Sequence, residues 1–180
     1  PGSQGLLCFP HFGGSGAPWW DPEMKGGFYG LTLAHEGVHV YRAILEGIAY
    51  DVRLIAEVFA NLGLDVATVR IVGGGAVSAL WCSIIGDVLG RPQTKAPQRE
   101  VGTLGAAMLA SVGAGVYDSV LAAAHAMTGE ETFAAFNGDN HKTYTRHFER
   151  YVGLLGRTKP APYPELAVLG RAAVKAEAVP

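Results

Sequence analysis

The sequence predicts an α/β layer fold, because helical and extended patterns alternate along its 180 residues. Residues 66–72 are rich in β-branched side chains and run directly into Gly73-Gly74-Gly75, after which a helical pattern starts near Ser78. A strand, a glycine turn and a helix in this order are typical of the sheet edge in α/β proteins. Too few strands are evident for a complete large sheet, so the sequence predicts part of a larger fold.

The N-terminal third predicts a short strand and a long helix. Residues 6–9 are apolar and lead into a turn-forming loop at 13–18, which favours a strand before the loop. After residues 27–31, apolar side chains recur at helical spacing up to Gly63. The pattern is formed by Val40, Ile44, Ile48, Val52, Ile55 and Phe59, so this segment is expected to be a buried or half-buried helix.

The remaining elements follow the glycine turn. Residues 78–89 predict a helix that ends at Gly90, and residues 91–95 favour a further short strand. Glu100 opens a helix of small residues over 104–112, which glycines 113 and 115 stop. A last amphipathic helix is indicated by Tyr144, Phe148, Tyr151, Val152 and Leu155. We therefore expect one domain over residues 1–156 and a loosely ordered, Pro- and Ala-rich tail over 157–180.

Composition narrows the functional classes. A net charge of −2 and the lack of any Lys/Arg run with interleaved aromatics argue against nucleic acid as a partner. The apolar runs are shorter than the roughly 20 residues that span a bilayer, and the first residues lack a basic leader, so a soluble, cytoplasmic protein is expected. Cys8 and Cys82 are far apart in the sequence, which indicates reduced thiols rather than a disulfide framework or a zinc site.

The glycine turn has a chemical interpretation and a structural one. Backbone N–H groups at a strand end, followed by a helix N-terminus, suit a phosphate or a nucleotide. The pattern completes neither a Walker A loop nor a dinucleotide fingerprint, and a tight turn alone explains three glycines. Taken without its surroundings, the turn favours the structural interpretation.

His35-Glu36-Gly37-Val38-His39 matches the zinc peptidase pattern His-Glu-x-x-His. That chemistry needs both histidines on one helix and a third ligand. Gly37 is a poor helix former, and Glu57 lies in the same predicted helix, from which it cannot fold back to the metal. We expect His39 at the helix entrance, with zinc hydrolysis as a remote alternative.

Residues 26–46 resemble the C-terminal signature of the FGGY carbohydrate kinases, which have the actin-like ATPase (ribonuclease H-like) fold and include xylulokinase, gluconokinase and glycerol kinase. The residues that fill the signature are Gly26, Phe28, Gly30, Leu31, His39, Val40, Ala43, Ile44, Leu45 and Glu46. This resemblance places His39 at a helix entrance and so uses the residues of the apparent zinc motif.

Three further blocks extend the resemblance to about residues 6–155. Gly73-Gly74-Gly75-Ala76 with Ser78 and Trp81 resembles the family's adenosine motif, and residues 87–92 and 100–107 resemble the blocks after it. The loop at 13–21 is similar to the glycerol kinase form, although the chain is otherwise closest to xylulokinases. Three positions depart from the usual pattern, namely Val77, Ser83 and Thr103.

The resemblance implies ATP- and Mg²⁺-dependent phosphorylation of a sugar or polyol hydroxyl by a longer polypeptide. Gly73, Gly74, Gly75, Ala76 and Ser78 are then nucleotide-binding residues, with no metal ligand among them. The catalytic aspartate is expected upstream of Pro1, in or near an N-terminal kinase domain that is the partner of this one. The chain alone is expected to be inactive.

Two questions stay open at this point. A nucleotide-binding or interaction module without chemistry is an alternative to the kinase. The residues do not identify the sugar, and a homodimer is one compatible assembly.

The carboxylates of the chain are expected to have structural roles. Glu46 and Asp51 are expected in caps or ion pairs, and Asp87 on a solvated helix face. Asp21 is expected on an exposed, turn-forming loop position.

Overall fold

The computed structural model describes residues 1–96, 100–129 and 132–158. The chain divides into two compact units, one formed by residues 1–66 with the chain from 138 onward, and the other by residues 67–137. Mixed helices and strands confirm the predicted α/β class. No helix within the described ranges has the length and apolar character that a bilayer crossing requires.

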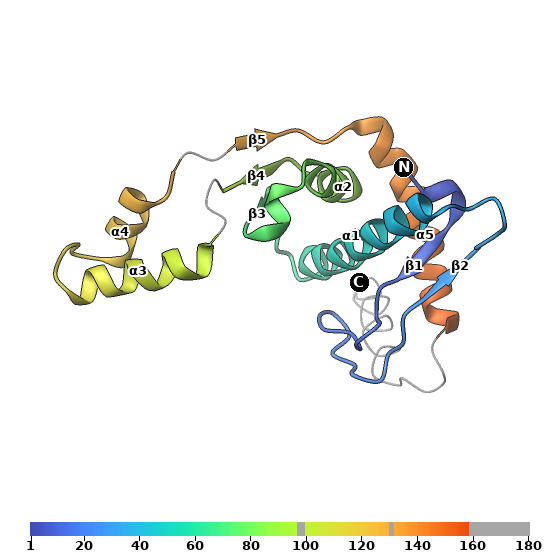
Figure 1. Ribbon diagram of the computed structural model, residues 1–180, viewed down its shortest axis with the longest axis horizontal. Coiled ribbons are helices and arrows are strands. Elements are labelled where there is room, and N and C mark those ends of the chain that lie inside the picture. Colours follow the sequence, from blue (N-terminus) through green and yellow to red (C-terminus); the bar gives the residue numbers. More distant parts are fainter. Residues whose placement is uncertain (97–99, 130–131, 159–180) are drawn as a thin grey trace, which may run out of the picture. The chain divides into compact units, whose positions relative to one another are not determined.

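The first unit is a strand hairpin packed with two long helices (Figure 1). β1 (Leu7–Phe9) pairs antiparallel with β2 (Gly27–Tyr29), with Leu7 opposite Tyr29. α1 (Gly37–Asn61) follows the hairpin, and α5 (Gly138–Thr158) returns from the end of the chain. A short 3-10 helix, η1 (Ser3–Gly5), precedes β1.

The long helix begins earlier than its apolar pattern. α1 starts at Gly37, three residues before Val40, because Glu36 and His39 form a capping box. The Glu36 side chain accepts a hydrogen bond from the His39 backbone, and His39 Nδ1 accepts one from the Glu36 N–H at 2.9 Å. The predicted position of His39 at the helix entrance is confirmed.

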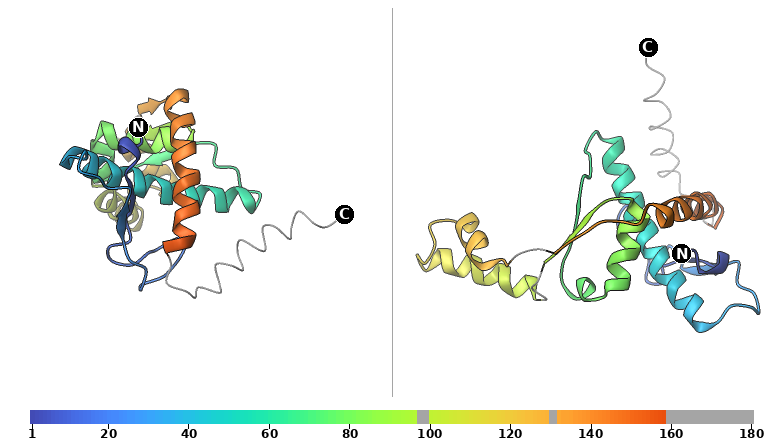
Figure 2. Two further views of the ribbon diagram at one scale, coloured as in Figure 1. Left: turned by 90° about the vertical axis from the view of Figure 1, so that its right-hand side faces the viewer. Right: turned by 90° about the horizontal axis from the view of Figure 1, so that it is seen from above.

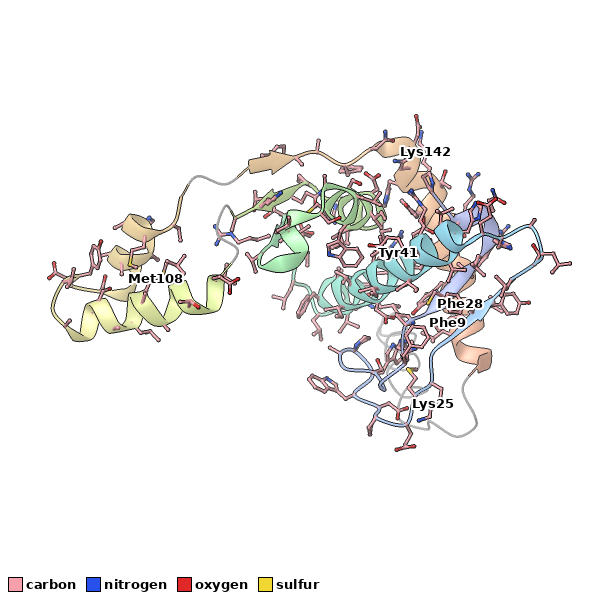
Figure 3. All side chains as sticks on the ribbon, in the orientation of Figure 1. Phe9, Lys25, Phe28, Tyr41, Met108 and Lys142 are labelled. Atoms are coloured by element: carbon pink, nitrogen blue, oxygen red, sulfur yellow. The ribbon has the colours of Figure 1, made fainter. Side chains whose placement is uncertain are left out.

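Aromatic rings join α1 to α5 and to the hairpin. Tyr50 of α1 is 1% exposed, and its ring lies 5.2 Å from that of Tyr151, measured between centroids. Tyr151 also stacks on Phe9 of β1, at 4.9 Å. Figure 3 labels Phe9 and Phe28 on the two strands. Because aromatic side chains bury much area each, this cluster forms the main core of the unit.

A buried carboxylate fixes the start of the chain to the two helices. Glu46 of α1 is 1% exposed and accepts hydrogen bonds from Gly2 N, Ser3 Oγ, Arg42 Nε and Tyr144 OH, at 2.8, 3.0, 2.8 and 3.0 Å. These bonds hold η1, in which Ser3 and Gln4 have positive φ angles. The ion pair expected for Glu46 is confirmed.

The second unit contains the glycine turn. β3 (Val69–Ile71) pairs parallel with β4 (Gln93–Lys95), which pairs antiparallel with β5 (Thr132–Ala134). A 3-10 helix, η2 (Gly74–Val77), and α2 (Ala79–Leu89) connect the parallel strands. α3 (Val101–Gly113) and α4 (Val120–Met127) lie side by side (Figure 2). The sequence did not predict β2, β5, α4 or either 3-10 helix.

The C-terminal boundary differs slightly from the expectation. α5 continues to Thr158, two residues beyond the predicted domain end. Residues 159–180 lie outside the described residues, so the predicted tail stays a prediction.

Three tyrosines make stability sensitive to alkaline pH. Burial, together with nearby carboxylates, raises the pKa of Tyr50, Tyr144 and Tyr151 above the ordinary value of about 10. The unfolded chain therefore releases these protons first as the pH rises. We expect the free energy of unfolding to fall above pH 10, by about 1.4 kcal/mol per pH unit for each tyrosine still protonated in the folded state.

Urea unfolding at pH 9, 10 and 11 measures this dependence. Tyr151→Phe removes one titrating group, so its stability should fall less steeply than that of the parent chain above pH 10. Parallel slopes for the two proteins would show that the Tyr151 hydroxyl does not contribute.

Candidate functional site

The predicted site residues lie in one short segment after β3. Gly73 has φ +74° and ψ −157°, a backbone conformation that favours glycine. η2 carries Gly74, Gly75 and Ala76, and Ser78 is the N-cap of α2. The strand, turn and helix therefore succeed one another as the sequence predicted, with a 3-10 turn between the strand and the helix.

The turn exposes its backbone. Gly74 and Gly75 are exposed, whereas Ala76 is 2% exposed. Across the described residues, neither the Gly74 nor the Gly75 N–H finds a hydrogen-bond acceptor. A Cβ at Gly74 would meet no atom within 4 Å, so the space over this residue is open. An anion or a flat polar ring can approach this turn, since both glycines are exposed and a Cβ at Gly74 would meet open space.

The contacts beneath the turn hold it in place. Ser78 Oγ accepts a hydrogen bond from Trp81 N at 3.2 Å, and this caps α2. Cys82 Sγ lies 3.6 Å from the Ala76 carbonyl oxygen. A Cβ at Gly75 would approach Trp81 Nε1 to 3.1 Å, so this glycine also permits close packing. Ser78 thus has a structural role, and its hydroxyl can still donate its own proton.

An apolar flank adjoins the glycines. Val72, Val77 and Leu80 are 44%, 49% and 45% exposed. Val77 and Ser83 are two of the positions that depart from the usual pattern, and Ser83 Oγ donates to the Leu80 carbonyl at 2.9 Å. The sequence did not predict this flank, and the signal for it was the departure from the usual pattern at Val77.

Two carboxylates are placed differently from the expectation. Asp87 is 6% exposed instead of solvated, and its Oδ1 accepts a hydrogen bond from Asn137 N at 2.7 Å. Asp21 is 8% exposed instead of lying on an open loop, and its Oδ1 accepts one from Glu23 N at 2.9 Å. Asp87 fixes the chain after β5, and Asp21 makes the turn that its sequence predicted.

Asp51 has the structural role expected of it. Its carboxylate contacts His11 Nε2 at 3.0 Å and accepts a hydrogen bond from Tyr151 OH at 2.8 Å. Burial, with the nearby Asp51 charge, raises the pKa of Cys8 to about 12. A thiol of such high pKa is a poor nucleophile near neutral pH.

The zinc motif is not arranged for metal binding. His35 precedes α1, and its Nδ1 accepts a hydrogen bond from Thr32 N at 3.0 Å. Glu36 and His39 are used in the capping box. In the part of the chain that the structure describes, no group of three His, Cys, Asp or Glu residues could hold a metal ion.

Residues 1–114 match the sequence profile of the C-terminal domain of the FGGY family of carbohydrate kinases. The chain belongs to this family. It is 38% identical over 132 residues to the glycerol kinase of Myxococcus xanthus, covering 73% of this chain and 27% of that protein. It is 31% identical over 158 residues to the xylulose kinase of Bacillus subtilis, covering 88% and 32% respectively.

A solved structure confirms the FGGY kinase fold. The Plasmodium falciparum glycerol kinase, determined with ADP, superposes with a TM-score of 0.67 at 24% identity, over 89% of this chain and 32% of that one. The chain therefore has part of the actin-like ATPase fold. It spans about a third or less of the length of the relatives it matches. Both glycerol kinases and xylulose kinases match, so the comparisons show the family of the chain without selecting one substrate.

Proposed function

We propose that this chain is the C-terminal domain of a longer kinase that transfers a phosphoryl group from ATP to a hydroxyl of a sugar or polyol. In that enzyme the chain forms the adenine-nucleotide side of the cleft. The proposal depends chiefly on the open backbone of Gly74 and Gly75 at the end of β3. The family membership and the ADP in the related glycerol kinase structure support it.

The residues of the turn suit the adenosine and the inner phosphate. The two exposed amides can donate hydrogen bonds to phosphate oxygens, and the positive end of α2 favours negative charge. The apolar flank of Val72, Val77 and Leu80 can cover a face of the purine, for which a methyl surface is sufficient. Ser78 would donate its hydroxyl proton to the nucleotide while remaining the cap of α2.

We assign no catalytic base to this chain. Glu46, Asp51 and Asp87 are committed to hydrogen bonds that hold elements together. We therefore propose that the base and the remaining phosphate contacts come from the N-terminal domain, whose residues would also hold the Mg²⁺ that would supply positive charge at the outer phosphates. Xylulose, gluconate and glycerol kinases all belong to the family, and the substrate choice is assigned to the N-terminal domain as well.

A phosphoryl-transfer assay tests whether catalysis requires the N-terminal domain in addition to this chain. The longer polypeptide should phosphorylate a sugar or a polyol, screened over pentuloses, hexonates and glycerol, whereas the 180-residue chain should show no turnover. Robust turnover by the chain alone would contradict the proposal.

Gly74→Val tests the nucleotide contact in the longer polypeptide. The added side chain meets no protein atom near its Cβ, so folding should be retained while the nucleotide is displaced. We expect the KM for ATP to rise about tenfold or more, equivalent to about 1.4 kcal/mol. Gly113→Val is the matched control, since a Cβ there also meets open space and the KM should not change. Equal KM values for ATP in Gly74→Val and Gly113→Val would show that Gly74 does not contact the nucleotide.

A further inference from the structure

A cavity of about 360 Å³ lies in the first unit, between the hairpin and α5. Its lining residues come from η1, β1, β2 and α5, and they are Gly5, Leu7, Tyr29, Arg150, Gly153 and Leu154. The volume lies within the range of small-molecule sites, which is about 300 to 1,000 Å³. None of these residues belongs to the glycine turn.

The walls follow from regular geometry. Leu7 and Tyr29 are directly opposite each other in the β1–β2 pair, so their side chains lie on the same face of the hairpin. Arg150, Gly153 and Leu154 are spaced i, i+3 and i+4 on α5, so they form one stripe of that helix. The hairpin face and the helix stripe form the walls of a largely apolar pocket that is open to solvent and has a single charged group, Arg150, at its exposed side.

Gly153 keeps this space open. It lies inside α5, where glycine is disfavoured relative to alanine. A Cβ at Gly153 would meet no atom within 4 Å, and the residue has no positive φ angle. Neither close packing nor backbone conformation therefore requires glycine at this position. A larger side chain would fill the middle of the stripe that lines the cavity.

Arg150 supplies the charge at the cavity. Among the residues that the structure describes, it has neither an ion pair nor a hydrogen-bond acceptor. A guanidinium binds a carboxylate through two parallel hydrogen bonds. The Tyr29 side chain is 54% exposed and offers an aromatic face and a hydroxyl. The site thus combines the Arg150 guanidinium with the apolar surfaces of leucine and tyrosine side chains.

We propose that this cavity binds a small organic carboxylate with an apolar, ring-sized body. The carboxylate pairs with Arg150, and the body lies between Leu7, Tyr29 and Leu154 over Gly153. The proposal is independent of the kinase assignment, because its residues are all in the first unit and the glycine turn is in the second.

The test uses 3-phenylpropionate, its neutral amide and inorganic phosphate as probes of the ¹⁵N-labelled 180-residue chain. Titration with 3-phenylpropionate should shift the amide resonances of Gly5, Leu7, Gly153 and Leu154. The amide should bind at least about tenfold more weakly, since it lacks the charge, and phosphate should leave these resonances unmoved because it lacks the body. Equal affinity of acid and amide, or shifts confined to other residues, would overturn the proposal.

Three variants complete the test. Gly153→Leu should abolish the shifts while keeping or raising the melting temperature, because it fills the cavity and improves the helix. Arg150→Gln should weaken binding of the acid about tenfold, whereas Arg146→Gln, on the same helix but outside the lining, should not. Equal effects of the two arginine variants would indicate general charge attraction and overturn the site. Binding by the chain but not by the longer polypeptide would show that another segment covers the cavity, which also contradicts the proposal.

Discussion

Gly47→Ala is expected to destabilise the chain by about 3 kcal/mol or more, because overpacking here involves backbone that cannot move independently. A Cβ at Gly47 would overlap the carbonyl oxygen of Cys8, where α1 crosses β1. Cys8 is fully buried and packs with Leu6 and Ala43, so the strand has no space into which it can retreat. Urea unfolding followed by circular dichroism measures the loss.

Gly153→Ala is the matched control for Gly47→Ala. Both glycines are inside long helices of the first unit, but a Cβ at Gly153 meets no atom within 4 Å. This control should be neutral or more stable by up to about 1 kcal/mol, the difference in helix propensity. A similar effect of both substitutions would mean that helix propensity, and not the contact with Cys8, determines the cost.

Glu46→Ala is expected to lower the free energy of unfolding by about 3 to 5 kcal/mol, as found when one partner of a buried ion pair is removed. The substitution leaves Arg42 Nε and the Tyr144 hydroxyl proton without their acceptor, and it releases Gly2 and Ser3 from α1. Amide hydrogen exchange should accordingly show loss of protection at η1 and along the contact between α1 and α5.

Glu57→Ala provides the comparison for Glu46→Ala. Arg53 and Glu57 form an i,i+4 pair on α1, like Arg42 and Glu46, but nearer to the C-terminal end of the helix. The Glu57 side chain is 49% exposed, and its Oε1 lies 3.2 Å from Arg53 Nε. An exposed pair of this kind contributes only about 0.5 kcal/mol. If the two alanine variants lost equal stability, burial of Glu46 would not be the source of its effect.

Local features of the fold could be predicted from the sequence. The helical pattern of α1, the strand before Gly73 and the start of a helix near Ser78 all depend on residues within a few positions of one another. Which side of α1 is buried was not evident in this way, because the helix buries Ala43, Glu46, Gly47, Ala49 and Tyr50, whereas Ile48 and Phe59 of the apolar pattern are exposed. The glycine turn belongs to the same class, since Gly73 needs a positive φ angle that its own backbone determines. The turn could thus be predicted locally, whereas its proposed nucleotide role came from the resemblance of Gly73 to Ser78 to the family's adenosine motif.

Long-range contacts could not be predicted in this way. The Asp87 carboxylate is buried because Asn137, 50 residues later, donates to it. Glycine is unfavourable inside a helix, and the reason for Gly47 is evident only from its contact with the Cys8 carbonyl, which is 39 residues earlier in the chain. β5 has only three residues, and its pairing with β4 is what defines it as a strand. These features depend on segments that are distant in sequence, which patterns within one segment do not report.

The most direct test of the central claim is a titration of the ¹⁵N-labelled 180-residue chain with millimolar ADP. We predict that the amide resonances of Gly74, Gly75 and Ala76 shift first and most, and that Gly74→Val removes these shifts while leaving the rest of the spectrum unchanged. Shifts confined to other residues, or retained in Gly74→Val, would contradict the assignment of this turn to the nucleotide.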